Sequence, residues 1–474
     1  MNTPDSGFRR KMLTLERRFF RAPGANLSVV ARIRGEIAQD KLRSALTKLR
    51  QMHPLLGVRV VLDSHQDAWF SSDGVTELQL KVIPRDSDDQ WMKVVQEEHS
   101  IAFDFEKGPL VRVILLKSPE LSDLIIFCQH TICDGISLAN LTRDTLLCIS
   151  EPERELSPET DTPLPIPDNF PIDFSGNKLT NIIKKKIAER MNEKWRRDRV
   201  IFNEEDFRNI HRAYFKTYQY RIVTAELSEV DVLSLIDVCR QNQVTVNSAI
   251  GVAFLAGRHD VIGKYANNIQ NIAVNVRNRL KRSAEYAFGL FAVGVDFRLG
   301  YNPEKPFWDS VRSFNKRVKH IMDIREDLQR LADHSKYDAT LIEGIKFAAH
   351  VRLAPSEFDR NSKLSAFSNN DRNVAVMLAK MSLSRYPGLV VTNLGSLNYP
   401  TKYGPLELEK LFFPSYASPF QDATLTMGVV TVGGKLTITL NFMVLTDHTI
   451  NSRVTLMENI KESAIGHLIK AMGR

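Results

Sequence analysis

The sequence predicts an α/β protein that is divided into two domains. At 474 residues, the chain is longer than a single hydrophobic core usually organises. Short apolar runs typical of strands alternate with amphipathic stretches typical of helices along the chain. Between residues 151 and 177 the composition shifts to prolines and acids with little apolar periodicity, which is typical of a linker. We therefore place the boundary near Asp173, giving domains 1–173 and 174–474.

The composition is that of a soluble globular protein, with 43% hydrophobic and 25% charged residues. No apolar stretch reaches the roughly 20 residues of a membrane helix, and the N-terminal residues lack the apolar core of a signal peptide, so we expect a cytoplasmic protein. The net charge of +8 fits an anionic partner. No recognised nucleic-acid motif is visible, and an acidic carrier protein or the phosphates of coenzyme A would suit this charge as well.

The four cysteines predict neither a metal site nor a disulfide framework. Cys128, Cys133, Cys148 and Cys239 fall in or beside apolar segments without paired metal-type spacing. We therefore expect buried, reduced thiols and no bound metal.

The first domain is predicted to begin with a short helix and a strand and to continue as alternating helices and strands. Proline 54 ends the second helix, because the residue before a proline is pushed out of the helical region. Helices are expected at Arg10–Phe20, Leu42–Leu49 and Trp91–Ile101, and strands at Leu27–Ile33, Val58–Val61, Gly74–Val82, Leu110–Leu116 and Leu124–Phe127.

The second domain is predicted to alternate in the same way. Ser228 and Asp231 have the spacing of a capping box, which marks the start of a helix. Helices are expected at Leu179–Ile201, Val232–Cys239, Thr245–Ala256, Phe307–Leu331 and Thr449–Met472. Strands are expected at Ile272–Arg277, Phe288–Val295, Gly388–Val391, and in a hairpin of residues 423–432 and 435–444 around Gly433-Gly434. The basic run over Leu179–Ile201 is usually a solvated face, and less often a docking surface.

The segment Cys128-Gln129-His130-Thr131-Ile132-Cys133-Asp134-Gly135 places a histidine and an aspartate where a buried strand ends. Imidazole can take and return a proton near neutral pH, so His130 is a candidate general base, although a histidine near an aspartate is often structural. Asp134 either orients that ring or pairs with a cation elsewhere. Gly135 stands at the junction with a predicted helix, where a residue without a Cβ can adopt a backbone conformation strained for others.

The pattern H-x-x-x-D-G after an apolar strand resembles the active-site motif of the coenzyme-A-dependent acyltransferase superfamily. This group includes chloramphenicol acetyltransferase, plant-type alcohol acyltransferases, nonribosomal condensation domains and polyketide-associated acyltransferases. Further stretches are similar to the same family and are spread over most of the chain: His53-Pro54-Leu55-Leu56, Phe103–Arg112, Ile272–Arg277 and Thr392-Asn393-Leu394-Gly395.

The resemblance implies two chloramphenicol-acetyltransferase-like domains, each a mixed sheet with helices, around a central channel with His130 near its midpoint. It implies His130 as the catalytic base and a salt bridge between Arg277 and Asp134, so that Asp134, Gly135 and Arg277 support the site. Asn393 could donate to a developing oxyanion, or it could cap its own turn. His53, which has no chemically useful neighbour in sequence, is expected to be structural.

The implied function is transfer of an acyl group from a phosphopantetheine thioester to a hydroxyl acceptor, forming an ester in lipid or secondary-metabolite biosynthesis. The donor would be an acyl-CoA or an acyl-carrier protein, used as co-substrate with no permanently bound cofactor, by a monomer. A covalent route through Cys133 is disfavoured, because its apolar setting and lack of a dedicated base point to a packed thiol.

Two departures favour a free-standing ester-forming enzyme. Condensation domains often carry a second histidine where this chain has Gln129, and the Asp-Phe-Gly-Trp-Gly stretch of plant-type enzymes is absent. The length also suggests one such unit without a carrier or adenylation domain. The alternatives are an amide-forming condensation enzyme and a non-catalytic scaffold that kept the fold.

Overall fold

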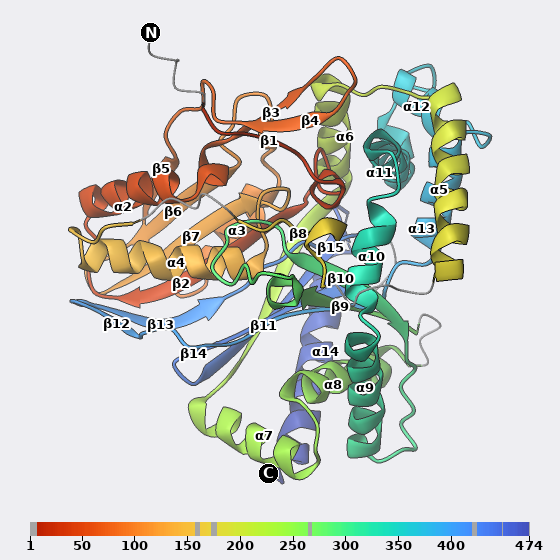
Figure 1. Cartoon of the computed structure of the whole chain (residues 1–474). Coiled ribbons are helices and arrows are strands. Elements are labelled where there is room, and N and C mark those ends of the chain that lie inside the picture. The colour runs from red at the N-terminus through yellow and green to blue at the C-terminus, as the bar shows by residue number, and fades with distance from the viewer. Residues whose placement is uncertain are drawn as a thin grey trace.

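The computed structural model describes residues 7–156, 162–171, 178–263, 268–419, 424–447 and 449–473. Two six-stranded mixed sheets and one three-stranded sheet organise this part of the chain (Figure 1). The α/β fold with two mixed sheets that the sequence predicts is confirmed.

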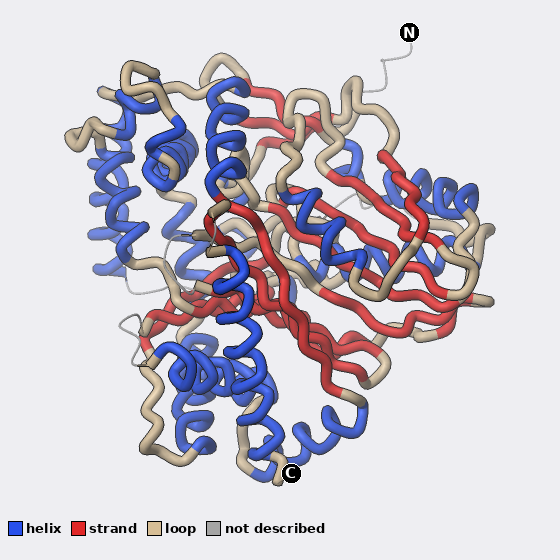
Figure 2. Tube along the Cα trace, turned by 180° about the vertical axis from the view of Figure 1, so that it is seen from behind, coloured by secondary structure: helices blue, strands red, loops and turns tan. Residues whose placement is uncertain are grey.

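The first sheet holds the strand that leads into the histidine motif. Its order is β12-β13-β2-β7-β6-β5, with bounds Lys402–Tyr403, Leu406–Phe412, Asn26–Arg34, Leu121–Gln129, Val111–Lys117 and Gln79–Pro84. Helices α2 (Gln39–Met52) and α4 (Gly135–Ser150) cover one face, and α3 (Gln90–His99) lies on the other (Figures 1 and 2). Because β7 is covered on both faces, every residue from Ser122 to Gln129 is buried.

The second sheet has the order β10-β9-β11-β14-β15-β8, with bounds Ala292–Arg298, Ile269–Asn275, Leu389–Leu397, Leu425–Val432, Lys435–Leu445 and Tyr218–Leu227. The β14–β15 hairpin pairs as predicted. Helices from the second half of the chain lie near the C-terminal end of the molecule in Figure 1: α7 (Glu229–Gln241), α8 (Val246–Ile262), α9 (Phe307–Asp323) and α14 (Ile450–Ala471).

A group of helices lies beside both sheets. Its members are α1 (Thr14–Arg17), α5 (Lys178–Arg197), α6 (Glu204–Thr217), α10 (Glu326–His334), α11 (Ala339–Leu353), α12 (Lys363–Ser368) and α13 (Val374–Ser384). The small sheet β1-β4-β3 spans Arg9–Lys11, Ala68–Ser71 and Arg59–Leu62. One hydrophobic cluster joins strands of the first sheet to α11 and α13, so the N-terminal and C-terminal parts share a core.

The predicted division into 1–173 and 174–474 stays a prediction, because Asp173 lies outside the described residues. The structure adds that the chain crosses back. Strand β13, from the C-terminal part, pairs antiparallel with β2 and completes the first sheet. Residues on both sides of any single boundary near 173 therefore build that sheet.

Several predicted elements differ from the structure. Residues 10–20, predicted as one helix, form the end of β1 and the four-residue α1. The predicted strand Gly74–Val82 begins only at Gln79, and the predicted helix Phe307–Leu331 is broken at Arg325, whose φ is 52°. The predicted strand Phe288–Val295 begins only at Ala292. The preceding residues form a loop whose backbone bonds the histidine motif, as described next.

Candidate active site

His130 stands directly after β7 in a tight turn that several backbone contacts hold. Its backbone N–H donates to the carbonyl oxygen of Ala25 over 2.9 Å. Its ring nitrogen Nδ1 lies 2.7 Å from the carbonyl oxygen of Cys133. The Phe19 ring packs on the imidazole with ring centroids 4.0 Å apart. The imidazole is therefore held on one edge and on one face while part of it stays exposed.

These contacts fix both the tautomer and the charge of His130. A carbonyl oxygen can only accept, so Nδ1 must carry the proton, which leaves the lone pair on Nε2. Desolvation by burial lowers the pKa of His130 below its ordinary value of 6.5, against the opposing effect of the Cys133 carbonyl. The ring is consequently neutral near pH 7 and able to accept a proton at Nε2.

Asp134 faces away from this chemistry and pairs with Arg277. The two side chains form a bidentate ion pair, with Nη1 2.8 Å from Oδ2 and Nη2 2.9 Å from Oδ1. Both are almost fully buried, at 2% and 1% side-chain exposure. Burial by itself would raise the pKa of Asp134, but the guanidinium and two backbone N–H donors outweigh it and lower the pKa. The salt bridge that the resemblance implies is present.

Asp134 also begins helix α4. Its Oδ1 accepts from the backbone N–H of Ser137 over 2.9 Å, so it is the N-cap residue. Its Oδ2 accepts from the backbone N–H of Phe291 over 2.8 Å, and its own N–H donates to the carbonyl oxygen of Gly289. One carboxylate thus ties the histidine turn, α4 and the 288–291 loop together.

Sequence reasoning missed Ser137 and the 288–291 loop. The Ser137 hydroxyl donates to the carbonyl oxygen of Gly289 over 2.8 Å and accepts from Arg277 Nη2 over 2.7 Å. The Arg277 guanidinium also lies 4.5 Å from the centroid of the Phe291 ring. Arg277 itself lies in a 3-10 turn after β9, not at the end of the strand. A polar residue three positions after an N-cap aspartate is the only local signal for Ser137.

Gly135 is required by close packing and not by backbone strain. Its φ is not among the positive values of the chain, which corrects the expectation of a conformation strained for other residues. A Cβ at this position would lie 2.4 Å from the Phe413 ring and 2.7 Å from Leu394 Cδ2. Glycine therefore lets the start of α4 approach the middle of β11 and the segment after β13.

Asn393, in the middle of β11 where the pairing with β14 shifts register, caps its own turn. Its Oδ1 accepts from the backbone N–H of Gly395 over 2.7 Å, and its Nδ2 donates to Oδ1 of Asn247 over 3.1 Å. The following residue, Leu394, reaches Gly135. Of the two roles expected for Asn393, the structure contains the cap, and contact with an oxyanion stays a prediction.

Gln129 bridges the histidine turn and the α1 segment. Its Nε2 donates to the carbonyl oxygen of Phe19 over 2.7 Å, and its Oε1 accepts from the backbone N–H of Thr131 over 2.5 Å. Because the Phe19 ring packs on His130, the Gln129 side chain fixes both the Phe19 backbone and the turn that carries the imidazole. The only sign of this role in the sequence is that Gln129 replaces the second histidine that condensation domains often carry.

We expect Gln129→Leu to lower kcat about tenfold with a smaller change in KM. The substitution leaves a buried N–H and C=O without partners, at a cost of about 1–3 kcal/mol, and releases Phe19 from the imidazole. Steady-state kinetics combined with urea unfolding checks this. Phe19→Leu, which removes the ring but keeps the backbone bond, should lower kcat in the same direction. Unchanged kcat in both variants would remove the positioning role.

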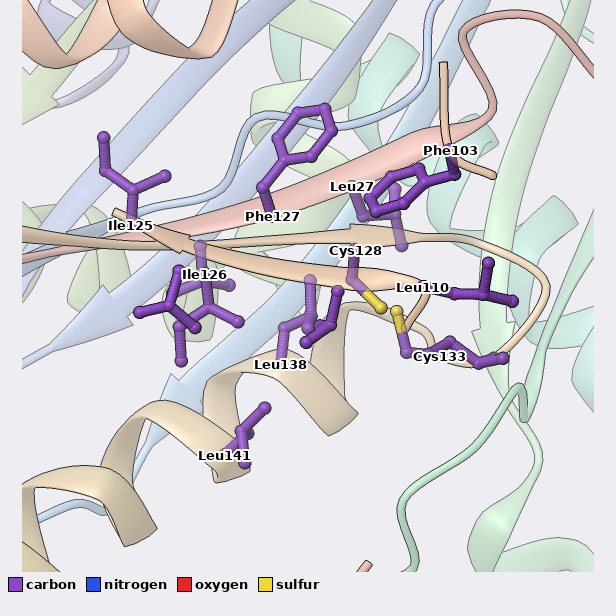
Figure 3. Close-up of a cluster of buried hydrophobic side chains, with 14 of the residues drawn as sticks. Leu27, Phe103, Leu110, Ile125, Ile126, Phe127, Cys128, Cys133, Leu138 and Leu141 are labelled. Carbon is purple, nitrogen blue, oxygen red and sulfur yellow. The ribbon is translucent and has the colours of Figure 1, made fainter. Parts of the chain in front are cut away.

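Cys133 contributes its carbonyl group and not its thiol. Its side chain is fully buried beside Cys128, in the apolar cluster shown in Figure 3. Burial raises the pKa of the Cys133 thiol well above its ordinary value, which disfavours the nucleophilic thiolate. All four cysteines are free and buried, as predicted.

His53 lines a cavity of about 170 Å³ with Glu16, Leu164 and Phe288. The imidazole is 3% exposed, and its ring centroid is 5.5 Å from that of Phe288. Within the described residues, no group of three or more histidines, cysteines or acids is arranged to hold a metal ion. No helix in the described part of the chain is long and apolar enough to cross a membrane.

Comparisons with known proteins show the family of this chain. Residues 8–345 match the Condensation domain family. Phosphinothricin tripeptide synthetase PhsC of Streptomyces viridochromogenes is 25% identical over 332 residues, which are 67% of this chain and 30% of that protein. The chain therefore spans less than a third of that curated relative.

Two solved structures resemble the whole chain. TRI3 trichothecene 15-O-acetyltransferase from Fusarium sporotrichioides superposes with a TM-score of 0.63 at 12% identity, covering 98% of this chain and 97% of that one. Polyketide synthase associated protein 5 from Mycobacterium tuberculosis gives 0.56 at 15% identity, with 96% and 97% covered. At these identities the likeness concerns the fold, which is the tandem chloramphenicol-acetyltransferase-like arrangement of condensation domains.

Proposed function

Because the chain belongs to the condensation-domain family, whose members are generally catalytic transferases, we propose that it transfers an acyl group from a phosphopantetheine thioester to a hydroxyl acceptor. The observation that carries this proposal is the state of His130. A neutral imidazole, held at Nδ1 by a carbonyl group and partly exposed, presents Nε2 as a proton acceptor.

The reaction follows from that proton acceptor. Nε2 of His130 takes the proton from the acceptor hydroxyl as its oxygen forms a bond to the thioester carbonyl carbon. The tetrahedral oxyanion then collapses, the carbon–sulfur bond breaks, and the imidazolium returns the proton to the leaving thiolate. No acyl-enzyme is needed when both substrates are bound together in reach. Asp134 and Arg277 hold the turn and take no part in the proton transfer.

Amide formation is the second candidate, because the curated relative is named a tripeptide synthetase. The two reactions differ only in the nucleophile, which is an amine for the amide and a hydroxyl for the ester. One feature supports the ester: Gln129 stands where condensation domains often carry a second histidine, and its side chain bonds the Phe19 carbonyl group instead. Both products require the same base and the same thioester.

The test is thiol release from acyl-CoAs and acyl-carrier proteins, with matched alcohol and amine acceptors and mass spectrometry of the products. We expect release that depends on the alcohol and an ester product. Release only with the amine would replace the ester by the amide. Absence of release from every donor, in a protein that is folded by circular dichroism, would overturn the catalytic proposal in favour of a scaffold.

The pH dependence of kcat/KM should show a single acid limb. The pKa of His130 is lowered, so its basic form is populated throughout the neutral range and is lost only as the pH falls through a value below 6.5. We expect a plateau above about pH 6.5, the ordinary histidine pKa. Measurement between about pH 4.5 and 8 checks this, and a limb midpoint above the ordinary value would contradict the assignment.

A further inference from the structure

The segment after α1 brings Phe19 onto His130 through a strained turn. Helix α1 ends at Arg17, and the chain adopts a left-handed conformation at Arg21, whose φ is 53°. This conformation is unfavourable for a residue with a Cβ, so contacts with the rest of the protein must hold it. Strain of this kind is often stored beside functional groups, and here it lies two residues from the ring that packs on the imidazole.

Two backbone carbonyl groups on either side of Phe19 accept hydrogen bonds from one lysine. The last carbonyl groups of a helix have no partner within that helix. Nζ of Lys346, on α11, donates to the carbonyl oxygen of Arg17 over 2.8 Å and to that of Phe20. Within the described residues, no backbone N–H donates to either oxygen. Lys346 is therefore the donor that fixes this part of the backbone.

A second side chain of α11 contacts the same segment. Glu343, one turn before Lys346, accepts from Nη2 of Arg17 over 2.5 Å and lies 3.5 Å from Nη1 of Arg21. These three ion-pair partners are buried, with side-chain exposures of 5%, 2% and 3%. Arg21 Nη1 also donates to the carbonyl oxygen of Phe202 over 3.0 Å. Helix α11 thus holds the backbone of the segment through Lys346 and its arginine side chains through Glu343.

Printed contacts lead from Lys346 to the base without a gap. Lys346 bonds the carbonyl groups of the residues at 17 and 20, and Gln129 bonds the carbonyl group of Phe19 between them. The Phe19 ring covers one face of the His130 imidazole, with ring centroids 4.0 Å apart. Desolvation lowers the pKa of His130, and a ring on its face contributes to that desolvation. Movement of the segment would therefore change both the orientation and the solvation of the imidazole.

We propose that Lys346 is a positioning residue for His130, because it holds the backbone on both sides of Phe19 and so keeps that ring on the imidazole. This inference rests on the proposed function and deepens it. It makes α11, a helix from the C-terminal part of the chain, responsible for the alignment of a base that stands in the N-terminal part.

The charge state of Lys346 does not interrupt this role near neutral pH. Desolvation by burial lowers the pKa of Lys346 to about 7, and Arg17 and Arg21 act in the same direction against Glu343. The ammonium group therefore loses a proton as the pH rises through that value. A neutral amine still carries two N–H bonds, one for each of the two carbonyl groups. A flat kcat/KM profile in the neutral range is thus compatible with the positioning role.

The test is a double-mutant cycle of Lys346→Met and Phe19→Leu, with steady-state kinetics and a pH profile for each protein. Lys346→Met keeps an unbranched stem and removes the donors. We expect it to lower kcat about tenfold and to leave KM within about twofold, because the base is misplaced while the substrate contacts remain. Water then reaches the imidazole, so the acid limb of kcat/KM should move to higher pH, toward the ordinary histidine value of 6.5.

The cycle separates positioning through Phe19 from a general effect of the substitution. If Lys346 acts through that ring, Lys346→Met should change kcat by less than about twofold in the Phe19→Leu background. Additive losses of kcat would overturn the proposal. An acid limb that stays at the wild-type position in Lys346→Met would also overturn it.

The matched structural control is Asn192→Leu, which loosens the start of α11 without a contact to the α1 segment. Asn192, on α5, donates to the carbonyl oxygen of Lys336 over 2.9 Å and accepts from the backbone N–H of Asp338 over 2.8 Å. The control should lower the urea midpoint, because it leaves buried polar groups without partners, with kcat within about twofold and the acid limb unchanged. An equal loss of kcat in the control would make the role of Lys346 structural only and overturn the proposal.

Two further measurements cover the remaining outcomes. If Lys346→Met does not fold by circular dichroism, Lys346→Gln, which keeps an N–H donor, should give smaller changes of kcat and of the acid limb in the same directions. Wild-type values of both would overturn the proposal. If the wild type transfers no acyl group, the proposed function fails, and NMR titration of the His130 ring nitrogens decides the positioning role. A higher pKa of His130 in the lysine variant would support it, and an equal pKa would overturn it.

Discussion

Replacing His130 by alanine is expected to lower kcat by a factor of about a hundred or more, because a positioned general base contributes roughly 10²–10⁴-fold. The loss should appear in kcat and not in the stability of the protein. His130 is partly exposed and offers one side-chain hydrogen bond, from Nδ1 to the Cys133 carbonyl group, so the fold does not depend on it. Thiol release under saturating donor, together with urea unfolding, measures both quantities.

The matched control is His65→Ala, which removes an exposed histidine from the turn between β3 and β4. It should leave kcat within about twofold of the wild type, because a surface substitution away from the site changes little. A His130→Ala variant that keeps a tenth or more of the wild-type rate would exclude His130 as the base. In that case the Nδ1 contact would be structural only.

Breaking the buried ion pair is expected to have the largest effect on stability. Asp134→Asn keeps the shape of the side chain and an oxygen that can cap α4, but it leaves the guanidinium of Arg277 buried without a counter-charge. Arg277→Met leaves the carboxylate of Asp134 buried without a counter-charge. Each single substitution should lower the free energy of unfolding by about 3–5 kcal/mol, as is typical when one partner of a buried pair is removed.

The double variant Asp134→Asn/Arg277→Met should be destabilised by less than the sum of the two single variants, because it removes both buried charges. Urea unfolding of the four proteins measures the coupling. The control is Asp309→Asn, which breaks the exposed pair with Arg312, both half exposed, and should cost less than about 1 kcal/mol. Additive effects at Asp134 and Arg277 would contradict the coupling that the geometry implies.

The difference in unfolding free energy between the wild type and Asp134→Asn should depend on pH. The folded-state pKa of Asp134 is lowered, so its ionised form contributes stability above the ordinary carboxyl value of 3.8, and that contribution is lost as the pH falls through the lower folded-state pKa. The stability gap between the wild type and Asp134→Asn should therefore be constant near neutral pH and narrow only in acid.

Much of the fold near the site could be predicted because it is local. The apolar run before His130 forms β7, and α4 begins at the predicted junction. The capping box of Ser228 and Asp231 is present at the start of α7. Hydrophobic period and capping chemistry act over a few residues, and a single sequence displays them directly.

Loops could not be predicted in the same way. The apolar run Phe288–Phe291 looks like the start of a strand. Its backbone groups instead bond Asp134 and Ser137, more than 150 residues away in sequence. Gly135 looks like a residue chosen for a strained turn, and its actual constraint is the Phe413 ring. In both positions, a tertiary contact decides between conformations that the local sequence permits equally.

The sequence by itself determined the alternating helices and strands, the buried thiols and the placement of His130 and Asp134 at a strand end. Only the tertiary structure decided that the imidazole of His130 has its lone pair on Nε2, that Phe19 packs on that ring, and which strands complete the first sheet. The physical reason is the range of the forces involved. Propensity and periodicity act between neighbours, whereas the Phe19 contact, the Arg277 pair and the pairing of β13 with β2 arise when distant segments share one buried space.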